Sequence, residues 1–183
     1  MSYYDEKQFI AAVDKNDMVI DRVEKWEAHK KGILHRGFTV ALMYQDAWVI
    51  QCRKHPVFDS VLDISCSSHP IFTSDGDSKT EDLPEAVIKT IHREWDLGDE
   101  VVTPALVHHR GSTHYKALDP LSEFVEHEIC HFLTVKLHSK PKPRDEFAYG
   151  MLMVPRAILV NKKNMIRSAC APWLTSLLPY FNE

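Results

Sequence analysis

The sequence predicts a single layered α/β domain built around a mixed β-sheet. Segments typical of strands alternate with two or three segments typical of helices, and 44% of the 183 residues are hydrophobic. A chain of this length can bury one substantial core but is too short for two comfortable ones. Strands mixed with helices favour a sheet that packs against helices. We therefore expect one domain that spans residues 1–183.

The first half of the chain carries the earliest predicted strands. Residues 17–23 and 37–52 are rich in β-branched and aromatic side chains, and the second segment predicts a hairpin that turns near Gln45 and Asp46. Polar and turn-forming residues then fill the stretch between residues 70 and 84, which predicts a surface loop.

An amphipathic helix is predicted to follow this loop. Pro84 suits the first helical position, apolar residues recur at helical spacing, and Gly98 predicts the end of the helix. Residues 101–107 and 124–137 return to strand character. The tail combines a predicted helix over ILVNKKNMIRSA with the aromatic segment APWLTSLLPYF.

Composition argues against several classes of protein. The net charge of −4 gives no reason to expect a nucleic-acid or membrane-surface binder. Four cysteines without a CxxC pair, and a start (MSYYDEKQF) without a basic and apolar signal region, favour a cytoplasmic protein with reduced thiols. The sequence contains no run of about 18 apolar residues, so we expect no segment that spans a membrane.

Two carboxylates stand two positions apart in the strand-like segment EFVEHEICHF, residues 123–132. Successive side chains of a strand point to opposite faces, so Glu126 and Glu128 share one face. Two like charges on a half-buried face are unfavourable unless a proton, an arginine or a metal ion lies between them. An exposed face of an edge strand is the alternative interpretation.

Histidines elsewhere in the chain could complete a metal site with these glutamates. His29, His35 and His69 are the candidates, although the chain has 11 histidines and most histidines of a protein are not ligands. Imidazoles combined with carboxylates suit Zn²⁺, Mn²⁺ or Fe²⁺, and two carboxylates would balance the charge of a divalent ion.

The chain resembles type I isopentenyl-diphosphate isomerases, which have a Nudix-like layered α/β/α fold and interconvert isopentenyl and dimethylallyl diphosphate. The resemblance covers nearly the whole chain and follows the order of the family's motifs. The matching stretches are VEKWEAH (23–29), LHRGF (34–38), QCRK (51–54), SCSSHP (65–70), AVIKTIHRE (86–94), YKALDP (115–120), EHEIC (126–130) and APW (171–173).

The resemblance implies a ligand set for one divalent metal, which would be Mn, Zn or Mg. The family binds this ion with two histidines, the histidine of an HP pair and both glutamates of an ExE segment. The matching residues here are His29, His35, His69, Glu126 and Glu128.

The resemblance also implies residues for the substrate. Lys25, Arg53 and Lys54 match residues that contact the diphosphate, as strongly charged oxygens require. Tyr115 and Trp173 match an active-site tyrosine and a tryptophan whose ring faces the reacting hydrocarbon. An indole face can stabilise a carbocation, which forms no hydrogen bonds.

A departure from the family lies in the predicted helix, where a glutamate would hold a second ion, Mg²⁺, on the diphosphate. Spacing from Gly98 selects Asp96, whereas the phase of the apolar residues selects Glu94, which we prefer. The glycine before the helix and the paired glutamates after it, which are usual in diphosphate-hydrolysing relatives, are missing.

Another departure lies at the reactive centre. The family places a catalytic cysteine two residues before the histidine of the HP pair, and this chain has Ser67 there. Strand alternation points Cys66 to the face opposite His69 unless a bulge intervenes. A hydroxyl is a much weaker acid than a thiol, so we expect either a slow isomerase or acid–base work by other groups.

The resemblance therefore predicts an isomerase that protonates one carbon of a prenyl diphosphate and deprotonates another, with Glu128 and Ser67 at the two proton-carrier positions. We expect a small-molecule partner, no nucleic acid and no membrane. One alternative is a Nudix-type hydrolase of another prenyl or nucleoside diphosphate. The other is a catalytically weak diphosphate-binding protein in which the metal only stabilises the fold.

Overall fold

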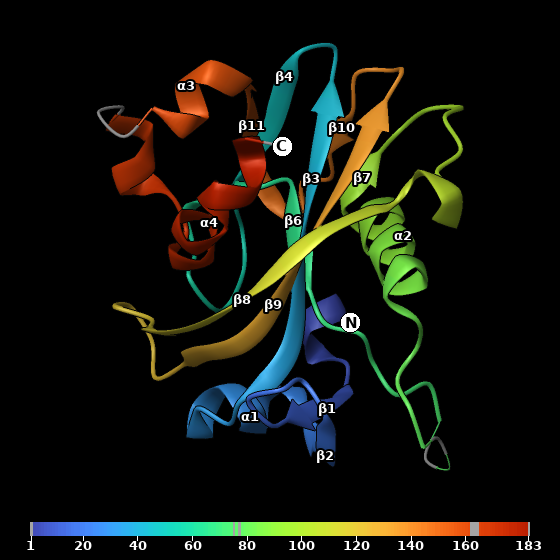
Figure 1. Cartoon of the computed structure of the whole chain (residues 1–183), viewed down its shortest axis with the longest axis vertical. Coiled ribbons are helices and arrows are strands. Elements are labelled where there is room, and N and C mark those ends of the chain that lie inside the picture. The colour runs from blue at the N-terminus through green and yellow to red at the C-terminus, as the bar shows by residue number, and fades with distance from the viewer. Residues whose placement is uncertain (1, 75, 77, 162–164, 183) are drawn as a thin grey trace.

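The computed structural model describes residues 2–74, 76, 78–161 and 165–182, and it confirms the predicted α/β class (Figure 1). The strands are Phe9–Val13 (β1), Val19–Glu24 (β2), His35–Tyr44 (β3), Ala47–Arg53 (β4), Leu62–Ile64 (β5), Cys66–Ser68 (β6), Trp95–Asp96 (β7), His108–Leu118 (β8), Val125–Leu137 (β9), Lys142–Pro143 (β10) and Ala148–Pro155 (β11). The α-helices are Lys25–Lys31 (α1), Leu83–Glu94 (α2), Arg156–Val160 (α3) and Pro172–Leu177 (α4). Short 3-10 turns span Tyr3–Asp5 (η1), Pro104–Leu106 (η2), Met165–Ala169 (η3) and Leu178–Asn182 (η4).

The long strand β3 organises the main sheet. It pairs in parallel with β9 over its whole length and antiparallel with β1, β4 and β6. Strand β8 adds antiparallel to the outer side of β9, and β11 adds to β4. Parallel and antiparallel pairs in one sheet are the mixed arrangement that the sequence predicts.

Helices cover both faces of this sheet, so the predicted layering is also confirmed. Helix α2 lies on one side of the sheet and the C-terminal segment with α3 and α4 lies on the other (Figure 1). One core packs Val87 and Ile91 of α2 against Phe38 and Leu133 of the sheet. A separate core packs α4 and η4 against the opposite face.

The predicted hairpin is confirmed at its turn. Strands β3 and β4 are joined by two residues, and Gln45 has a φ of 55°, which a tight hairpin turn requires. The strand predicted from residue 17 begins instead at Val19, because Asp17 has a φ of 62° and belongs to the preceding turn. The long strand predicted over 124–137 is confirmed as β9.

Three further features differ from the prediction. Helix α2 ends at Glu94 and not at Gly98, because Trp95 and Asp96 leave the helix to pair with β10. The strand predicted over 101–107 is wrong: this stretch contains the turn η2 at Pro104–Leu106, and the strand begins at His108. The helix predicted after Val154 is shorter, because α3 stops at Val160, and residues 162–164 lie outside the described part of the chain.

The loop predicted between residues 70 and 84 is confirmed over its described residues, which form no helix or extended strand before α2. Within the described residues, no helix is long and apolar enough to cross a membrane.

The phase of α2 can be tested by a matched pair of substitutions. Ile91→Ala removes a fully buried side chain and should lower the free energy of unfolding by about 2–5 kcal/mol. His92→Ala changes the exposed side of the same helical turn and should stay within about 0.5 kcal/mol. Equal effects in chemical denaturation would contradict this placement of the helix.

Candidate functional site

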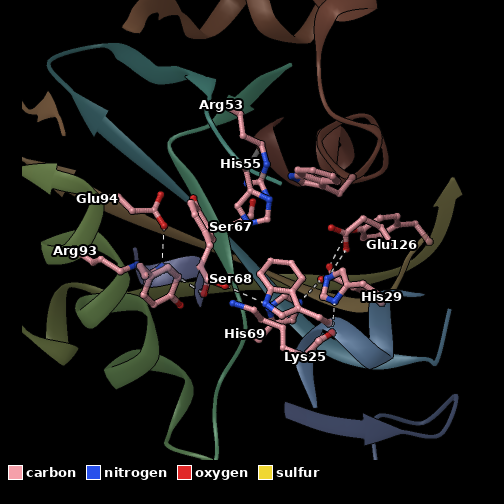
Figure 2. A pocket seen from close by; sticks show the side chains of 16 residues that line it. Lys25, His29, Arg53, His55, Ser67, Ser68, His69, Arg93, Glu94 and Glu126 are labelled. Atoms are coloured by element: carbon pink, nitrogen blue, oxygen red, sulfur yellow. Dashed lines mark hydrogen bonds and ion pairs between the residues drawn. The ribbon is translucent and has the colours of Figure 1, made fainter. Parts of the chain in front are cut away.

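A single pocket gathers side chains from both ends of the chain and from the middle of the sheet. Figure 2 shows Arg93 and Glu94 on one side of this pocket and His29 and Glu126 on the other. The lining residues are Tyr3, Tyr4, Lys25, Trp26, His29, Arg53, His55, Ser67, Ser68, His69, Arg93, Glu94, Tyr115, Glu126, Glu128 and Trp173.

Five of the predicted metal ligands meet in one cluster, and all of them except His35 line the pocket. His29, His35, His69, Glu126 and Glu128 each offer one ligand atom, and these five atoms all lie within 4.8 Å of one another. Pairing of β3 with β9 places His35 directly beside Glu128, and α1 brings His29 to Glu126. The two glutamates share one face of β9 and are both buried, as the strand alternation predicts.

Backbone carbonyls orient two of the histidines. The Nδ1 atom of His29 lies 2.6 Å from the carbonyl oxygen of Lys25, and Nδ1 of His35 lies 2.8 Å from that of Ile33. A carbonyl oxygen only accepts hydrogen bonds, so each Nδ1 must carry the proton. In the neutral ring the Nε2 atom then carries the lone pair, and this atom faces the cluster, as in a histidine metal ligand.

The cluster is incompletely paired without a cation. His69 Nε2 lies 3.0 Å from Glu128 Oε1, whereas His35 Nε2 is 3.5 Å from the same oxygen and His29 Nε2 is 3.6 Å from Glu126 Oε2. Among the described residues, His35 Nε2 and Glu126 Oε2 have no hydrogen-bond partner although both are buried. Buried polar atoms are rarely left in this way. The donor set therefore fits a divalent ion, which would satisfy these atoms and balance both carboxylates.

The protonation of Glu128 is controlled by its neighbours. Burial favours the neutral acid, but the neighbouring imidazoles of His35 and His69 outweigh burial and hold the pKa of Glu128 well below its usual value. Its other oxygen, Oε2, accepts a hydrogen bond of 2.7 Å from the Tyr115 hydroxyl. Burial and the charge of Glu128 raise the pKa of Tyr115 well above its usual value. Tyr115 is therefore a fixed hydroxyl donor beside a carboxylate.

Ser67 reaches the pocket and Cys66 does not. Cys66 is fully buried in the core under α2, and burial raises the pKa of its thiol well above the usual value. Ser67, Ser68 and His69 all line the pocket, so the exclusion of Cys66 agrees with the prediction although successive residues of this segment reach the pocket. The Ser67 hydroxyl lies 2.8 Å from that of Thr39 on the neighbouring strand β3.

The basic side chains of the pocket differ in part from those that the resemblance implies. Lys25 and Arg53 line the pocket, and burial together with the charge of Arg93 lowers the pKa of Lys25 to about 8. Lys54 does not line it, because its Nζ donates to the carbonyl of Asp145 at 2.9 Å on the surface. Arg93 supplies a third cation inside the pocket.

The choice between the two acidic residues at the end of α2 agrees with the apolar phase of the helix. Glu94 is buried and lines the pocket, whereas Asp96 is exposed in β7. Burial raises the pKa of Glu94, although Arg93 opposes this effect with a hydrogen bond of 2.8 Å to Oε1. Glu94 is not a member of the five-residue cluster.

Several pocket residues are absent from the sequence prediction. Arg93 directly precedes Glu94, and the REW triplet could have suggested that both enter the pocket. His55 lies two residues after Arg53 in an irregular segment, and burial with the charge of Arg53 lowers its pKa well below the usual value. Tyr3 and Tyr4 come from the N-terminal turn η1, whose position no local pattern in the sequence indicates.

Gly37 allows a test of metal binding in which no candidate ligand residue is itself substituted. A Cβ at Gly37 would collide with the Glu128 carboxylate, whereas a Cβ at Gly150 would meet nothing within 4 Å. We expect the wild-type protein to bind about one equivalent of Mn²⁺ or Zn²⁺ at the cluster. Gly37→Ala should weaken this binding by about 10–100-fold, the range for changes beside metal ligands, and Gly150→Ala should not.

Titration calorimetry on chelator-treated protein measures both affinities, and circular dichroism checks that each variant is folded. Unchanged affinity in a folded Gly37→Ala protein would place the metal elsewhere.

No family model matches this chain, and no curated protein matches it in sequence. Solved structures do match. The crystal structure of DR0079 from Deinococcus radiodurans has a TM-score of 0.65 at 16% identity, with 96% of this chain and 99% of that chain covered. The MutT protein from Methanosarcina mazei Go1 has a TM-score of 0.57 at 9% identity, with 81% and 93% covered.

A bifunctional NMN adenylyltransferase/ADP ribose pyrophosphatase from Francisella tularensis has a TM-score of 0.50 at 14% identity, and the match covers 79% of this chain and 41% of that one. Identities this low show the fold alone. The chain therefore has a Nudix-like fold.

Proposed function

We propose that the protein is a metal-dependent isomerase that interconverts isopentenyl and dimethylallyl diphosphate. The observation that carries the proposal is the arrangement of Glu128, Ser67 and Trp173 around one pocket. The reaction needs two positioned proton carriers and an apolar surface that tolerates a cation between them. The resemblance in sequence motifs supports the same activity.

The two proton carriers come from strands on either side of β3. Ser67 lies on β6 and Glu128 on β9, and both strands pair with β3. One carrier would give a proton to the terminal carbon of the alkene, and the other would remove a proton from the neighbouring carbon. Tyr115 holds the carboxylate of Glu128 through its hydrogen bond. A divalent ion bound by the cluster would neutralise its carboxylates and fix their orientation.

The aromatic side chains suit the charge that develops on the hydrocarbon. Protonation of the alkene produces a tertiary cation, and an aromatic face attracts a cation without forming a bond to it. Trp173 and Tyr115 lie with ring centroids 6.0 Å apart in the pocket. The indole N–H of Trp173 is bound by a buried carboxylate, which fixes the ring.

The other end of the pocket suits a diphosphate. Lys25, Arg53 and Arg93 contribute three cations, and Glu94 could hold a Mg²⁺ ion that the phosphate oxygens also bind. Arg93 replaces Lys54 in this proposal because the Lys54 side chain lies on the surface. Binding of the diphosphate would position the alkene near the two proton carriers.

Hydrolysis of a prenyl or nucleoside diphosphate is the alternative function. Two observations favour it. The fold is shared with the MutT protein and with an ADP ribose pyrophosphatase. The Ser67 hydroxyl is also a weaker acid than the thiol that it replaces, so it is less suited to proton transfer in an isomerase. Against it, Glu94 is the one acidic side chain of α2 that lines the pocket, and Asp96 is exposed. Purified protein with Mg²⁺ should convert isopentenyl diphosphate to dimethylallyl diphosphate. Release of phosphate from this substrate or from ADP-ribose would favour a hydrolase, and no reaction of either substrate would favour a binding protein.

Substitutions should separate catalysis from binding. Glu128→Gln removes a proton carrier and should lower kcat by about 10²–10⁴-fold with a smaller change in KM. Lys25→Ala should mainly raise KM, because it removes a diphosphate contact. Glu123→Gln changes an exposed glutamate on the same segment and should leave both constants unchanged. Metal content is measured for each variant. If Glu128→Gln and Lys25→Ala changed KM equally and left kcat unchanged, these roles would be contradicted.

Replacement of Ser67 by cysteine is expected to increase the isomerase activity. Ser67→Cys should raise kcat, because a thiol exchanges its proton near neutral pH far more readily than a hydroxyl. Cys66→Ala is the control and should change kcat little, since this thiol faces the core under α2. Loss of activity in Cys66→Ala would mean that the segment rearranges and that Cys66 is the working group.

A further inference from the structure

A pair of histidines on the neighbouring strands β8 and β9 lies apart from the pocket (Figure 1). His109 Nε2 lies 3.0 Å from His131 Nδ1. The other ring nitrogen of His131, Nε2, lies 2.9 Å from Asp17 Oδ2. His109 is exposed and His131 is half-buried. None of these three residues is among those that line the pocket.

A bulge in β8 brings the two imidazole rings together. The register between β8 and β9 shifts between His109 and Gly111, so that Arg110 is an extra residue at this point. Residues directly opposite each other in paired strands share a face, and His109 stands opposite Leu133, on the same face of β9 as His131. A regular β8 would turn His109 to the other face. Bulges that redirect a side chain in this way are frequent beside functional sites.

Asp17 determines which nitrogen of His131 carries a proton. Burial raises the pKa of Asp17, but hydrogen bonds from His131 and Arg36 outweigh burial and lower it. The ionised carboxylate only accepts hydrogen bonds, so Nε2 of His131 donates to it. In the neutral ring the lone pair is then on Nδ1, the atom that faces His109. A carboxylate that fixes the far nitrogen of the ring is a usual partner of a histidine metal ligand.

We propose that His109 and His131 form a second metal site, in which His109 Nε2 and His131 Nδ1 bind a divalent transition-metal ion of the Cu²⁺ or Ni²⁺ type and Asp17 orients the His131 ring. In the metal-free protein a proton between the two nitrogens takes the place of the ion. Water would fill the remaining coordination positions, because His109 is exposed. The inference goes beyond the proposed isomerase function and does not depend on it.

The distance between the two nitrogens indicates the class of metal. With metal–nitrogen bonds of about 2.0–2.1 Å, two ligand atoms of a tetrahedral ion are about 3.3 Å apart, and neighbouring ligand atoms of a square-planar ion are about 2.9 Å apart. The observed 3.0 Å is nearer to the square-planar value. Nitrogen ligands in this geometry are typical of Cu²⁺ and Ni²⁺, and Cu²⁺ has the highest affinity in the divalent series.

Another histidine pair on the same two strands is less suited to a cation. His114 Nε2 lies 3.1 Å from His127 Nε2, and His127 Nδ1 lies 2.9 Å from the carbonyl oxygen of Gly32. The partner that fixes this ring is therefore a neutral carbonyl group. Lys116 stands directly opposite His127 in the strand pairing, and its positive charge opposes the binding of a cation. The pair His114–His127 is thus a comparison for the proposed site within the same protein.

A titration with Cu²⁺ followed by magnetic resonance tests the site, because this paramagnetic ion broadens the signals of nearby nuclei. The wild-type protein is titrated, and its backbone amide and imidazole signals are recorded. We expect the signals of His109, Ser112 and His131 to broaden within about two equivalents of Cu²⁺, of which the five-residue cluster can take one. They should broaden before those of the His114–His127 pair and of the other exposed histidines.

Substitutions distinguish a built site from a chance contact. His131→Gln removes a ligand and should abolish the broadening at His109 and Ser112. Asp17→Asn keeps both ligands and suits the φ of 62° at this position, which asparagine tolerates. It should weaken Cu²⁺ binding at this site by about 10–100-fold. His92→Gln removes an exposed histidine of α2 and should change nothing at this site.

Broadening that begins at the His114–His127 pair, or that spreads evenly over the exposed histidines, would mean that Cu²⁺ binds adventitiously and would overturn the inference. Unchanged Cu²⁺ affinity in a folded Asp17→Asn protein would also overturn it, because the site would then lack its orienting carboxylate. Circular dichroism checks the fold of each variant. Should a variant unfold, the wild-type titration decides, since it needs no substitution. None of these results bears on the isomerase proposal, which is tested by turnover.

Discussion

The burial of Glu126 and Glu128 side by side is the constraint on which the rest of the site depends. Two carboxylates on one face of β9 repel each other in a low-dielectric interior unless positive charge lies between them. The chain surrounds them with His29, His35 and His69 and leaves two buried ligand atoms unpaired among its described residues. A divalent ion would satisfy this arrangement, which requires α1, β3, β9 and the residue after β6 to meet at one point.

Strand β3 meets that requirement. Its parallel pairing with β9 places His35 beside Glu128, and its antiparallel pairing with β6 brings Ser67 next to Thr39. Backbone hydrogen bonds of one sheet therefore fix the proposed proton carriers and the candidate ligands on β3 and β9, whereas His29 comes from α1 and His69 follows β6. Helices α2 and α4, which are packed on opposite faces, add Glu94 and Trp173 from the two sides. Rigid placement of this kind is what acid–base catalysis needs.

Local patterns in the sequence predict the features of this structure that depend on neighbouring residues of one strand or one helix. Strand alternation predicts the shared face of Glu126 and Glu128, and helix phase selects Glu94 over Asp96. Other features depend on distant contacts: α2 ends at Glu94 because Trp95 pairs with β10, some 48 residues later in the chain at Pro143. The sequence prediction also lacks Asp63, because the donors that contact this buried carboxylate, Arg53 of β4 and Trp173 of α4, lie on two separate elements that no spacing in the sequence relates.

Deuterium uptake tests the central claim most directly. The protein is incubated with isopentenyl diphosphate and a divalent metal in D₂O, and proton and phosphorus magnetic resonance follow the carbon skeleton and the diphosphate together. Proton transfer between Ser67, Glu128 and the substrate predicts dimethylallyl diphosphate with deuterium on carbon and an intact diphosphate. Cleavage of the diphosphate without deuterium on carbon would contradict the account, because it would mean that the pocket hydrolyses its substrate and transfers no proton to carbon.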